Sequence, residues 1–486
     1  MIVLLETLVK IKIDHSMKIT SFSIPCFYKN TYSDTIEDYL LVYNPVSEKG
    51  MVVLNKEAGF LFSQIDGKKN LKDILSVVKK KDAKALFADI KKAFADFLSS
   101  EIIYFNKPES KTKLFSKKPR HLGVWLHITN QCNLRCTYCY IYKTQEKMSN
   151  NIANKAIGKI FQSAKKHNFK KITFKFSGGE PLLEFKRILK FVNKIKQWGK
   201  KLKVETDFVV LTNGVLLTEK VAQTLKENTV RAAVSIDGLG KYHNKTRIFV
   251  NGKPSFKQVE QGIKNLIKAK VLFNVSITIT SKNIENIPDL TKYLLKRNIP
   301  FAFNFYRENP YVKEKLEGND KKLVNYLKKA YKLIYQNPPR YSLINGLLDR
   351  VVSKKPHLYT CGMGNSYIVV RHNGEMASCQ MTIEKSIGSI DDKDLIKTMQ
   401  KGDFTKAITV EEKTPCKKCQ WKYICCGGCP LLTLEQKGKC NVSSPYCVVY
   451  KTLIPEMLRI EAKRLIKYGS EVYKTQKQDI KSPFVL

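Results

Sequence analysis

Cysteine is distributed very unevenly along this chain, and its pattern limits what the chain can become. The 486 residues contain 13 cysteines: one is Cys26, three lie between Cys132 and Cys139, and nine lie between Cys361 and Cys447. An odd total, with no secretory signal, argues against a framework of disulfides. Clustered thiols in a reducing compartment are more often ligands of zinc or of iron–sulfur clusters. The sequence therefore predicts metal or cluster binding.

Length and composition predict a folded chain of several domains. At about 150 residues per domain, the length suggests about three domains. A hydrophobic content of 43% with 24 Phe and 23 Tyr is enough for real cores. The formal charge of +43 comes mainly from Lys, because only 12 of the 86 basic residues are Arg. Arg reads bases and phosphates in bidentate fashion, so its scarcity disfavours nucleic acid and favours a solvated Lys surface or an acidic partner.

Nothing in the sequence indicates membrane insertion or export. The opening MIVLLETLVKIKI is broken by Glu6 and Lys10, is too short to span a bilayer and has no small-residue cleavage site. No later stretch reaches 18 apolar residues without a charge. We expect a cytoplasmic protein with no membrane partner, whose translation starts at Met1 or Met17.

Apolar periodicity divides the chain into segments of different character. The first reads as short strands and three helices, typical of a small winged-helix module. After a Lys-rich linker, six apolar strands alternate with helices, which predicts an α/β fold with a parallel sheet rolled into a partial (β/α)6 TIM-like barrel. The Cys-rich segment has too little apolar periodicity for a core of its own. The expected boundaries are 36–105 (winged-helix module), 107–120 (linker), 121–310 (barrel), 311–356 (helical connector), 357–450 (Cys-rich domain) and 451–486 (C-terminal helix and tail).

The first chemical motif is QCNLRCTYCY, in the loop after the first strand of the predicted barrel. Its cysteines Cys132, Cys136 and Cys139 can hold three irons of a [4Fe–4S] cube and leave the fourth iron open for a substrate. The alternative is a structural zinc site completed by His121 or His127. Three cysteines without a fourth favour the open cube.

This spacing, with Tyr138 between the last two cysteines, resembles the radical S-adenosylmethionine (SAM) superfamily. FSGGEP, LTNG and SIDG, at the ends of later strands, carry the resemblance further. It implies that SAM chelates the open iron and is cleaved by one electron to methionine and a 5′-deoxyadenosyl radical, which abstracts a hydrogen atom from the substrate. The residues that it implies in SAM binding are Tyr138, Gly178, Gly179, Glu180, Thr212, Asn213, Ser235, Asp237 and Arg247.

A second set of cysteines lies toward the C-terminus. Read in pairs, as in CKKC, these cysteines are compatible with a zinc ribbon. The spacing of seven of them, however, resembles the SPASM domain of peptide-modifying radical SAM enzymes, which holds two auxiliary [4Fe–4S] clusters. The resemblance assigns Cys361, Cys379 and Cys429 to the first auxiliary cluster, and Cys416, Cys419, Cys425 and Cys447 to the second.

Two positions depart from this resemblance. SKKPHLY, before Cys361, contains no cysteine. The first auxiliary cluster therefore has either an open iron, as in relatives that dock a substrate cysteine there, or a fourth ligand from Cys426 or Cys440. Sulfatase-maturing relatives place an acidic base directly after the cysteine equivalent to Cys379. Here that residue is Gln380, which disfavours their specific activity.

The N-terminal segment LNKEAGFLFSQIDGKKNLKDI resembles the peptide-recognition elements of ribosomal peptide modification, which bind a leader peptide as an added strand. A purely structural cap on the barrel is the alternative. Together the resemblances imply an oxidoreductase that modifies a ribosomally made peptide or protein by a thioether or carbon–carbon crosslink or by side-chain oxidation. Flavodoxin or ferredoxin is the expected electron donor. The alternatives are a radical SAM enzyme acting on RNA or a small molecule, and a non-catalytic iron–sulfur carrier or scaffold.

Overall fold

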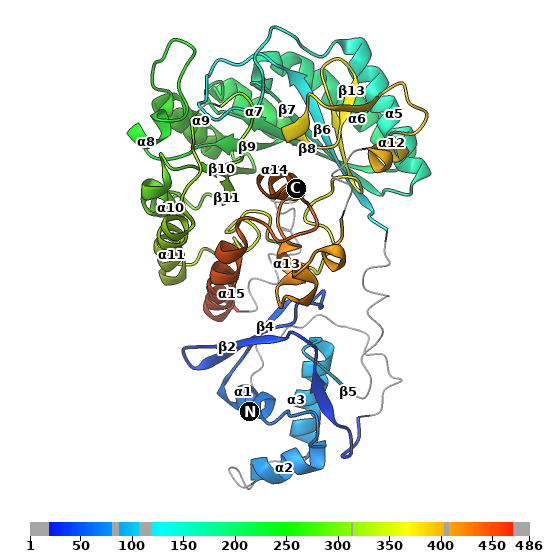
Figure 1. Cartoon of the computed structure of the whole chain (residues 1–486), viewed down its shortest axis with the longest axis vertical. Helices are drawn as coiled ribbons and strands as arrows, with labels where there is room; N and C mark the ends of the chain where they lie inside the picture. Colours follow the sequence, from blue (N-terminus) through cyan, green and yellow to red (C-terminus); the bar gives the residue numbers. More distant parts are fainter. Residues whose placement is uncertain (1–18, 80–86, 106–117, 313, 403–407, 470–486) are drawn as a thin grey trace.

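The structure is a computed structural model and describes residues 19–79, 87–105, 118–312, 314–402 and 408–469. The alternative starts at Met1 and Met17, most of the expected linker and the last residues of the tail lie outside the described residues. In Figure 1 the N-terminal unit lies at one end of the long axis and the large sheet at the other, with α13 and α15 between them. Among the described residues, no helix is both long and apolar enough to cross a bilayer.

The N-terminal unit has an apolar core of its own. Val42, Leu54 and Phe94 are fully buried in a cluster separate from the main core. Two small antiparallel sheets, ordered β2-β3-β4 and β1-β5, accompany three helices, of which α1 packs on β3 and β4. The strands and helices expected here are present, while the winged-helix classification stays a prediction. The elements are β1 (Pro25–Phe27), β2 (Tyr32–Ile36), β3 (Tyr39–Tyr43), β4 (Met51–Leu54), α1 (Lys56–Ser63), α2 (Leu71–Lys79), α3 (Phe87–Ser99) and β5 (Ile103–Phe105).

Six parallel strands in chain order form most of a nine-stranded sheet. Helices alternate with these strands, which confirms the α/β prediction. The strands are β6 (His121–Thr129), β7 (Lys171–Gly178), β8 (Glu205–Thr212), β9 (Arg231–Ser235), β10 (Phe273–Ile279) and β11 (Phe301–Phe305). The helices are α5 (Asn150–Lys166), η1 (Pro181–Glu184), α6 (Phe185–Leu202), α7 (Glu219–Glu227), α8 (Lys241–Asn244), α9 (Phe256–Lys268), η2 (Ile284–Asn286) and α10 (Ile287–Lys296).

Side chains alternate between the two faces of this sheet along each strand. On β7, Phe174 and Phe176 belong to the main apolar core, where the ring of Phe174 contacts Phe161 of α5. Thr173, Lys175 and Ser177 therefore point to the opposite face, which we call the inner face. The parallel strands end at one edge of the sheet, so the motifs that follow them meet there.

The Cys-rich region joins the same sheet. β12 pairs in parallel with β6, and β13 and β14 continue the sheet in antiparallel pairing. Ile368 and Met376 of this region are fully buried in the main core. The sheet is therefore mixed and has three strands more than the six expected, because four-residue strands such as β12 leave almost no periodic signal. The added strands are β12 (Tyr367–Val370), β13 (Glu375–Ala377) and β14 (Ser386–Ser389).

The remaining helices connect the sheet to the N-terminal unit. α15 (Cys447–Tyr468), which begins earlier than the expected 451, packs against α11 (Asp320–Gln336), β2 and β4. Arg459 of α15 donates from Nε to Asp34 Oδ2 of β2 at 2.6 Å. The other helices are α12 (Leu395–Lys401), α13 (Lys422–Cys425), α14 (Pro430–Lys437), η3 (Gln380–Thr382), η4 (Val410–Glu412) and η5 (Cys416–Lys418).

Candidate functional site

The loop after β6 holds three cysteines, each beside a nitrogen donor from another residue. Burial raises the pKa of the Cys132 thiol and raises that of Cys136 to about 12. A thiolate there needs compensating positive charge, which bound iron supplies, so the donor set fits a cluster. The three pairs are Asn213 Nδ2 with Cys132 Sγ at 3.8 Å, Arg247 Nη1 with Cys136 Sγ at 3.9 Å, and Lys143 Nζ with Cys139 Sγ at 3.1 Å.

The two glycines of FSGGEP let the end of β7 approach this loop. A Cβ on Gly178 would lie 2.2 Å from the Thr129 carbonyl oxygen, and one on Gly179 would lie 2.1 Å from the Gln131 carbonyl oxygen. Gly178 also has a φ of +149°, which L side chains rarely adopt. Gly179 N donates to Thr129 O at 2.6 Å. Glycine is required here by the backbone of the cysteine loop itself.

Glu180 ties the ends of β7 and β8 together from a fully buried position. Its carboxylate accepts hydrogen bonds from Thr212 Oγ1 at 2.7 Å, from Asn213 N at 2.8 Å and from Leu182 N at 3.0 Å. Burial raises its pKa to about 7 in spite of these donors. The sequence placed Glu180, Thr212 and Asn213 in one site, and the structure brings all three together.

The raised pKa of Glu180 predicts a pH-dependent stability of the protein without cofactors. Between about pH 4.5 and 7 the folded state binds more protons at Glu180 than the unfolded state does. The free energy of unfolding therefore falls as the pH rises through this window, by about 3 kcal/mol. We expect Glu180→Gln to remove this part of the slope in urea unfolding at pH 5, 6 and 7. The exposed control Glu219→Gln should keep the parent's slope, and an equal slope in Glu180→Gln would contradict the assignment.

Asp237 is the centre of a second buried network, after β9. Its Oδ2 accepts from Arg247 Nε at 2.7 Å, from Tyr138 Oη at 2.5 Å and from Thr246 Oγ1 at 3.3 Å, and its Oδ1 accepts from Thr278 N at 3.0 Å. The guanidinium of Arg247 also lies 5.3 Å from the centre of the Tyr138 ring. Three of the residues implied in SAM binding thus bond to one another and fix the strand end beside the cysteine loop. Ser235, the last residue of β9, is partly buried at the same edge.

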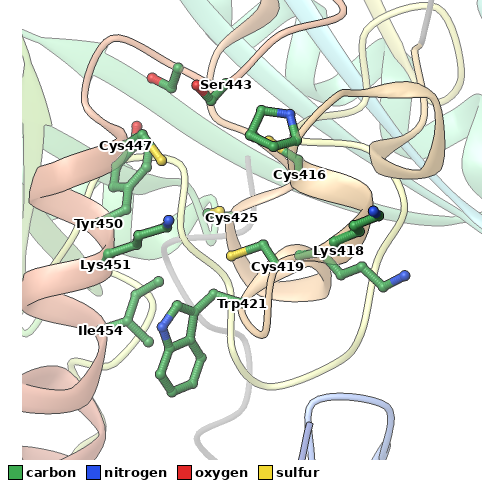
Figure 2. A pocket seen from close by; sticks show the side chains of 14 residues that line it. Cys416, Lys418, Cys419, Trp421, Cys425, Ser443, Cys447, Tyr450, Lys451 and Ile454 are labelled. Atoms are coloured by element: carbon green, nitrogen blue, oxygen red, sulfur yellow. The ribbon is translucent and has the colours of Figure 1, made fainter. Parts of the chain in front are cut away.

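Four of the C-terminal cysteines line one cavity of about 200 Å³. Figure 2 shows that they reach it from the turns around η5 and α13 and from the start of α15. Trp421 and Tyr450 also line this cavity. The structure therefore brings together the set that the resemblance assigns to the second auxiliary cluster: Cys416, Cys419, Cys425 and Cys447.

The other three predicted ligands line a smaller cavity of about 40 Å³, together with Arg350, Tyr367 and Gln380. These three are Cys361, Cys379 and Cys429. Burial alone would raise the pKa of Cys429, but Arg307 and Arg350 hold it below its usual value. Nearby cations suit the negative charge that thiolates bring to a cluster. The three-cysteine set is therefore assembled without a fourth cysteine in the cavity lining.

The alternative ligands have other partners. Cys426 Sγ donates to His357 O at 3.0 Å, and neither it nor Cys440 lines either cavity. His121 bonds to Thr173 Oγ1 at 2.8 Å and His127 to Asn130 Oδ1 at 2.7 Å. No group of three or more His, Cys, Asp or Glu side chains in the described part of the chain is arranged to hold a single metal ion. Cluster thiolates bind different irons and need no such convergence, so the arrangement favours clusters over zinc.

Sequence reasoning missed three cations beside the cysteines: Lys143, Arg307 and Arg350. Lys143 follows Cys139 by four residues, which was a local signal that could have been used. Arg307 and Arg350 reach Cys429 only through the fold, as their effect on its pKa shows.

Comparison with known proteins agrees with the three-cysteine motif in the loop after β6. Residues 126–294 match the model of the Radical SAM superfamily. This segment is a radical SAM domain. One relative of this chain is the cysteine-type anaerobic sulfatase-maturating enzyme of Clostridium perfringens. The two sequences are 27% identical over 371 residues, which cover 70% of this chain and 96% of the relative. The serine-type enzyme of Bacteroides thetaiotaomicron is 26% identical over 339 residues, covering 62% and 80%.

A solved structure extends the similarity in three dimensions. Native anSMEcpe with bound AdoMet and Cp18Cys peptide has a TM-score of 0.57 at 25% identity, covering 72% of this chain and 99% of that chain. The protein is accordingly an enzyme that carries a radical SAM domain. Radical SAM domains bind a [4Fe–4S] cluster together with SAM, and the three-cysteine set after β6 fits such a cluster.

Proposed function

We propose that this enzyme cleaves SAM reductively and modifies a ribosomally made peptide or protein by a crosslink or a side-chain oxidation. The observation that carries the proposal is that the fold assembles three cysteine groups. One is the open set in the loop after β6, one lines a cavity with Tyr367 of β12, and one lines a cavity with the start of α15. Relatives named as sulfatase-maturating enzymes act on a protein, and one solved neighbour holds a peptide.

The ligands follow from this arrangement. Cys132, Cys136 and Cys139 would hold the SAM cluster, and this group would supply radical chemistry that removes a hydrogen atom from the substrate. Glu180 and Asp237 keep the strand ends rigid around that site through buried hydrogen bonds. Both carboxylates already accept several hydrogen bonds from the protein. We therefore assign them the role of positioning the backbone at the strand ends around SAM.

The two cysteine-lined cavities would hold the auxiliary clusters. The cavity with four cysteines provides a complete set of ligands, whereas the cavity with three leaves one iron open. Gln380 lines the latter cavity, and its Oε1 lies 3.7 Å from Cys379 Sγ. A neutral amide cannot take a proton as a carboxylate does, so this enzyme performs a reaction other than sulfatase maturation.

The N-terminal unit binds the leader of the substrate. Its three-stranded sheet has β2 and β4 at its edges, and an extended peptide adds to a sheet through such an edge. Ion pairs from Arg459 to Asp34 and from Lys463 to Glu37 hold β2 against α15. The unit is therefore fixed to the catalytic part, and a bound leader would deliver its core segment from a constant position. An electron donor such as flavodoxin or ferredoxin completes the system.

The proposal predicts a mass change in a precursor peptide. We expect peptides encoded beside the gene, incubated anaerobically with reconstituted enzyme, SAM and reductant, to lose two hydrogen atoms as measured by mass spectrometry. A variant with Cys132, Cys136 and Cys139 changed to alanine should leave them unaltered. A Cys-containing sulfatase peptide should also stay unaltered because of Gln380. SAM cleavage without change in any precursor would count against a peptide substrate.

A further inference from the structure

Lys175 is a buried lysine on the inner face of the sheet. Its side chain lies on β7 and the residue is only 5% exposed. In register across the sheet, Lys175 stands between Trp125 of β6 and Val209 of β8, with Arg231 of β9 beyond. Residues in register on parallel strands point to the same face, so these side chains form one row on the inner face.

Two hydrogen-bond donors in this row have no partner. Lys175 Nζ and Trp125 Nε1 are both buried and make no hydrogen bond within the described structure. Trp125 is 7% exposed. An ammonium and an indole N–H can only donate. Both donors lie in register on adjacent strands, so acceptor atoms that arrive from outside the fold can satisfy them.

The charges around Lys175 are cationic. Burial, followed by the charges of Arg350 and Arg231, lowers the pKa of Lys175 to about 8. The side chain is therefore mainly an ammonium at pH 7. The carboxylate of Asp207 is taken by Arg231, and that of Asp349 by Arg307. No described carboxylate forms an ion pair with Lys175. A buried charge without a counter-charge is costly in the folded state, so its complement is an anion that arrives from outside the fold.

The position of Lys175 fits a place for substrate. Its Nζ lies 5.5 Å from the centre of the Tyr367 ring, and Tyr367 also lines the three-cysteine cavity. Toward the other end, Ser177 points to the same inner face and directly precedes Gly178 of the SAM-binding edge. Lys175 thus stands between the site of the SAM cluster and that of the first auxiliary cluster. Arg350 acts on both places, because its charge lowers the pKa of Lys175 and that of Cys429.

We propose that Lys175, with Trp125 beside it, binds a carboxylate of the substrate on the inner face of the sheet. The source of the carboxylate rests on the proposed function: in a peptide it is the side chain of Asp or Glu. The ammonium supplies the charge, and the indole N–H supplies a second hydrogen bond that fixes orientation. Lys175 and Trp125 together therefore determine which residue of the substrate reaches the site beside SAM.

Binding of small probes to the reconstituted, SAM-loaded enzyme tests this assignment. The probes are acetyl-Gly-Asp-Gly-amide, its Asn counterpart and free glutarate, and the affinity is measured by calorimetry. We expect the parent to bind the Asp peptide about 10- to 100-fold more tightly than the Asn peptide, as for hydrogen bonds to a charged group. In Lys175→Met this preference should vanish, and in Trp125→Phe it should be reduced.

Controls separate this role from a structural one. Lys171→Met changes a lysine of the same strand that is paired with Glu205, and it should keep the full preference. Because Met removes an unpaired buried charge, we expect Lys175→Met to unfold at the same or a higher temperature than the parent, with the same iron content. If Lys175→Met does not fold, Lys175→Gln replaces it in the same titrations.

Each result has a definite meaning. Equal binding of the Asp and Asn peptides and no glutarate binding by a parent enzyme that cleaves SAM would overturn the role of Lys175 and leave the radical SAM activity standing. A preference that persists in Lys175→Met would overturn it as well. Binding of glutarate that depends on Lys175, with neither peptide bound, would keep the carboxylate site and instead contradict the peptide substrate.

Discussion

Replacing Cys132, Cys136 and Cys139 together by alanine is expected to abolish SAM cleavage. These thiols lie in one loop beside Asn213, Arg247 and Lys143, and they are the ligands that we assign to the SAM cluster. Without them the cluster is lost and no electron reaches SAM. We expect formation of 5′-deoxyadenosine, measured by chromatography after adding reductant, to fall to background, while the two auxiliary clusters remain.

A matched variant shows whether this loss is specific. Cys440 is a partly exposed cysteine outside both cavities, so Cys440→Ala should cleave SAM at the parent rate. A triple variant that still forms 5′-deoxyadenosine would refute the assignment of the first cluster. A parent that holds clusters but never cleaves SAM would support the alternative of an electron carrier or scaffold.

Changing Asp237 to Asn is the second substitution with a large expected effect. Asp237 is fully buried and its carboxylate accepts bonds from Arg247, Tyr138, Thr246 and the Thr278 backbone. Removing its charge leaves the guanidinium of Arg247 buried without a counter-charge, which costs about 3–5 kcal/mol. We expect the free energy of unfolding in urea to fall by that amount, and SAM cleavage to fall because Tyr138 and Arg247 lose their fixed positions.

The control is an ion pair in solvent. Glu219 and Lys268 form a pair whose side chains are both mostly exposed, and such pairs contribute at most about 1 kcal/mol. Glu219→Gln should therefore change neither stability nor SAM cleavage appreciably. A loss of stability in Asp237→Asn no larger than that of Glu219→Gln would show that the buried network does not hold the strand ends.

The parts of the site that could be predicted from sequence are those with a local signal. Cys132, Cys136 and Cys139 lie within eight residues of chain. Gly178 ends β7 and Asp237 lies two residues after β9, and the ends of parallel strands meet at one edge whatever the detailed packing. For this reason strand periodicity and short motifs were enough to place the α/β sheet and the residues around its edge.

Long-range features lay beyond that reasoning. β12 is only four residues long, so its pairing with β6 could not be predicted from periodicity. Lys175 is a polar residue in the alternating run KITFKF, a pattern that suggests a solvent-exposed side chain. In the structure it is buried, with its Nζ near the ring of Tyr367 of β12. The pairing of Arg247 with Asp237 joins residues ten positions apart that no local pattern marked as partners. The first two features depend on segments far apart in the chain.

Iron and sulfide per chain measure the central claim, that three cysteine groups each hold one [4Fe–4S] cluster. After anaerobic reconstitution we expect about twelve irons and about twelve sulfides in the parent, and about eight of each in the variant lacking Cys132, Cys136 and Cys139, because each cube contains four. About four irons together with bound zinc in the parent would contradict the account, since it would remove both auxiliary clusters from the cysteine-lined cavities.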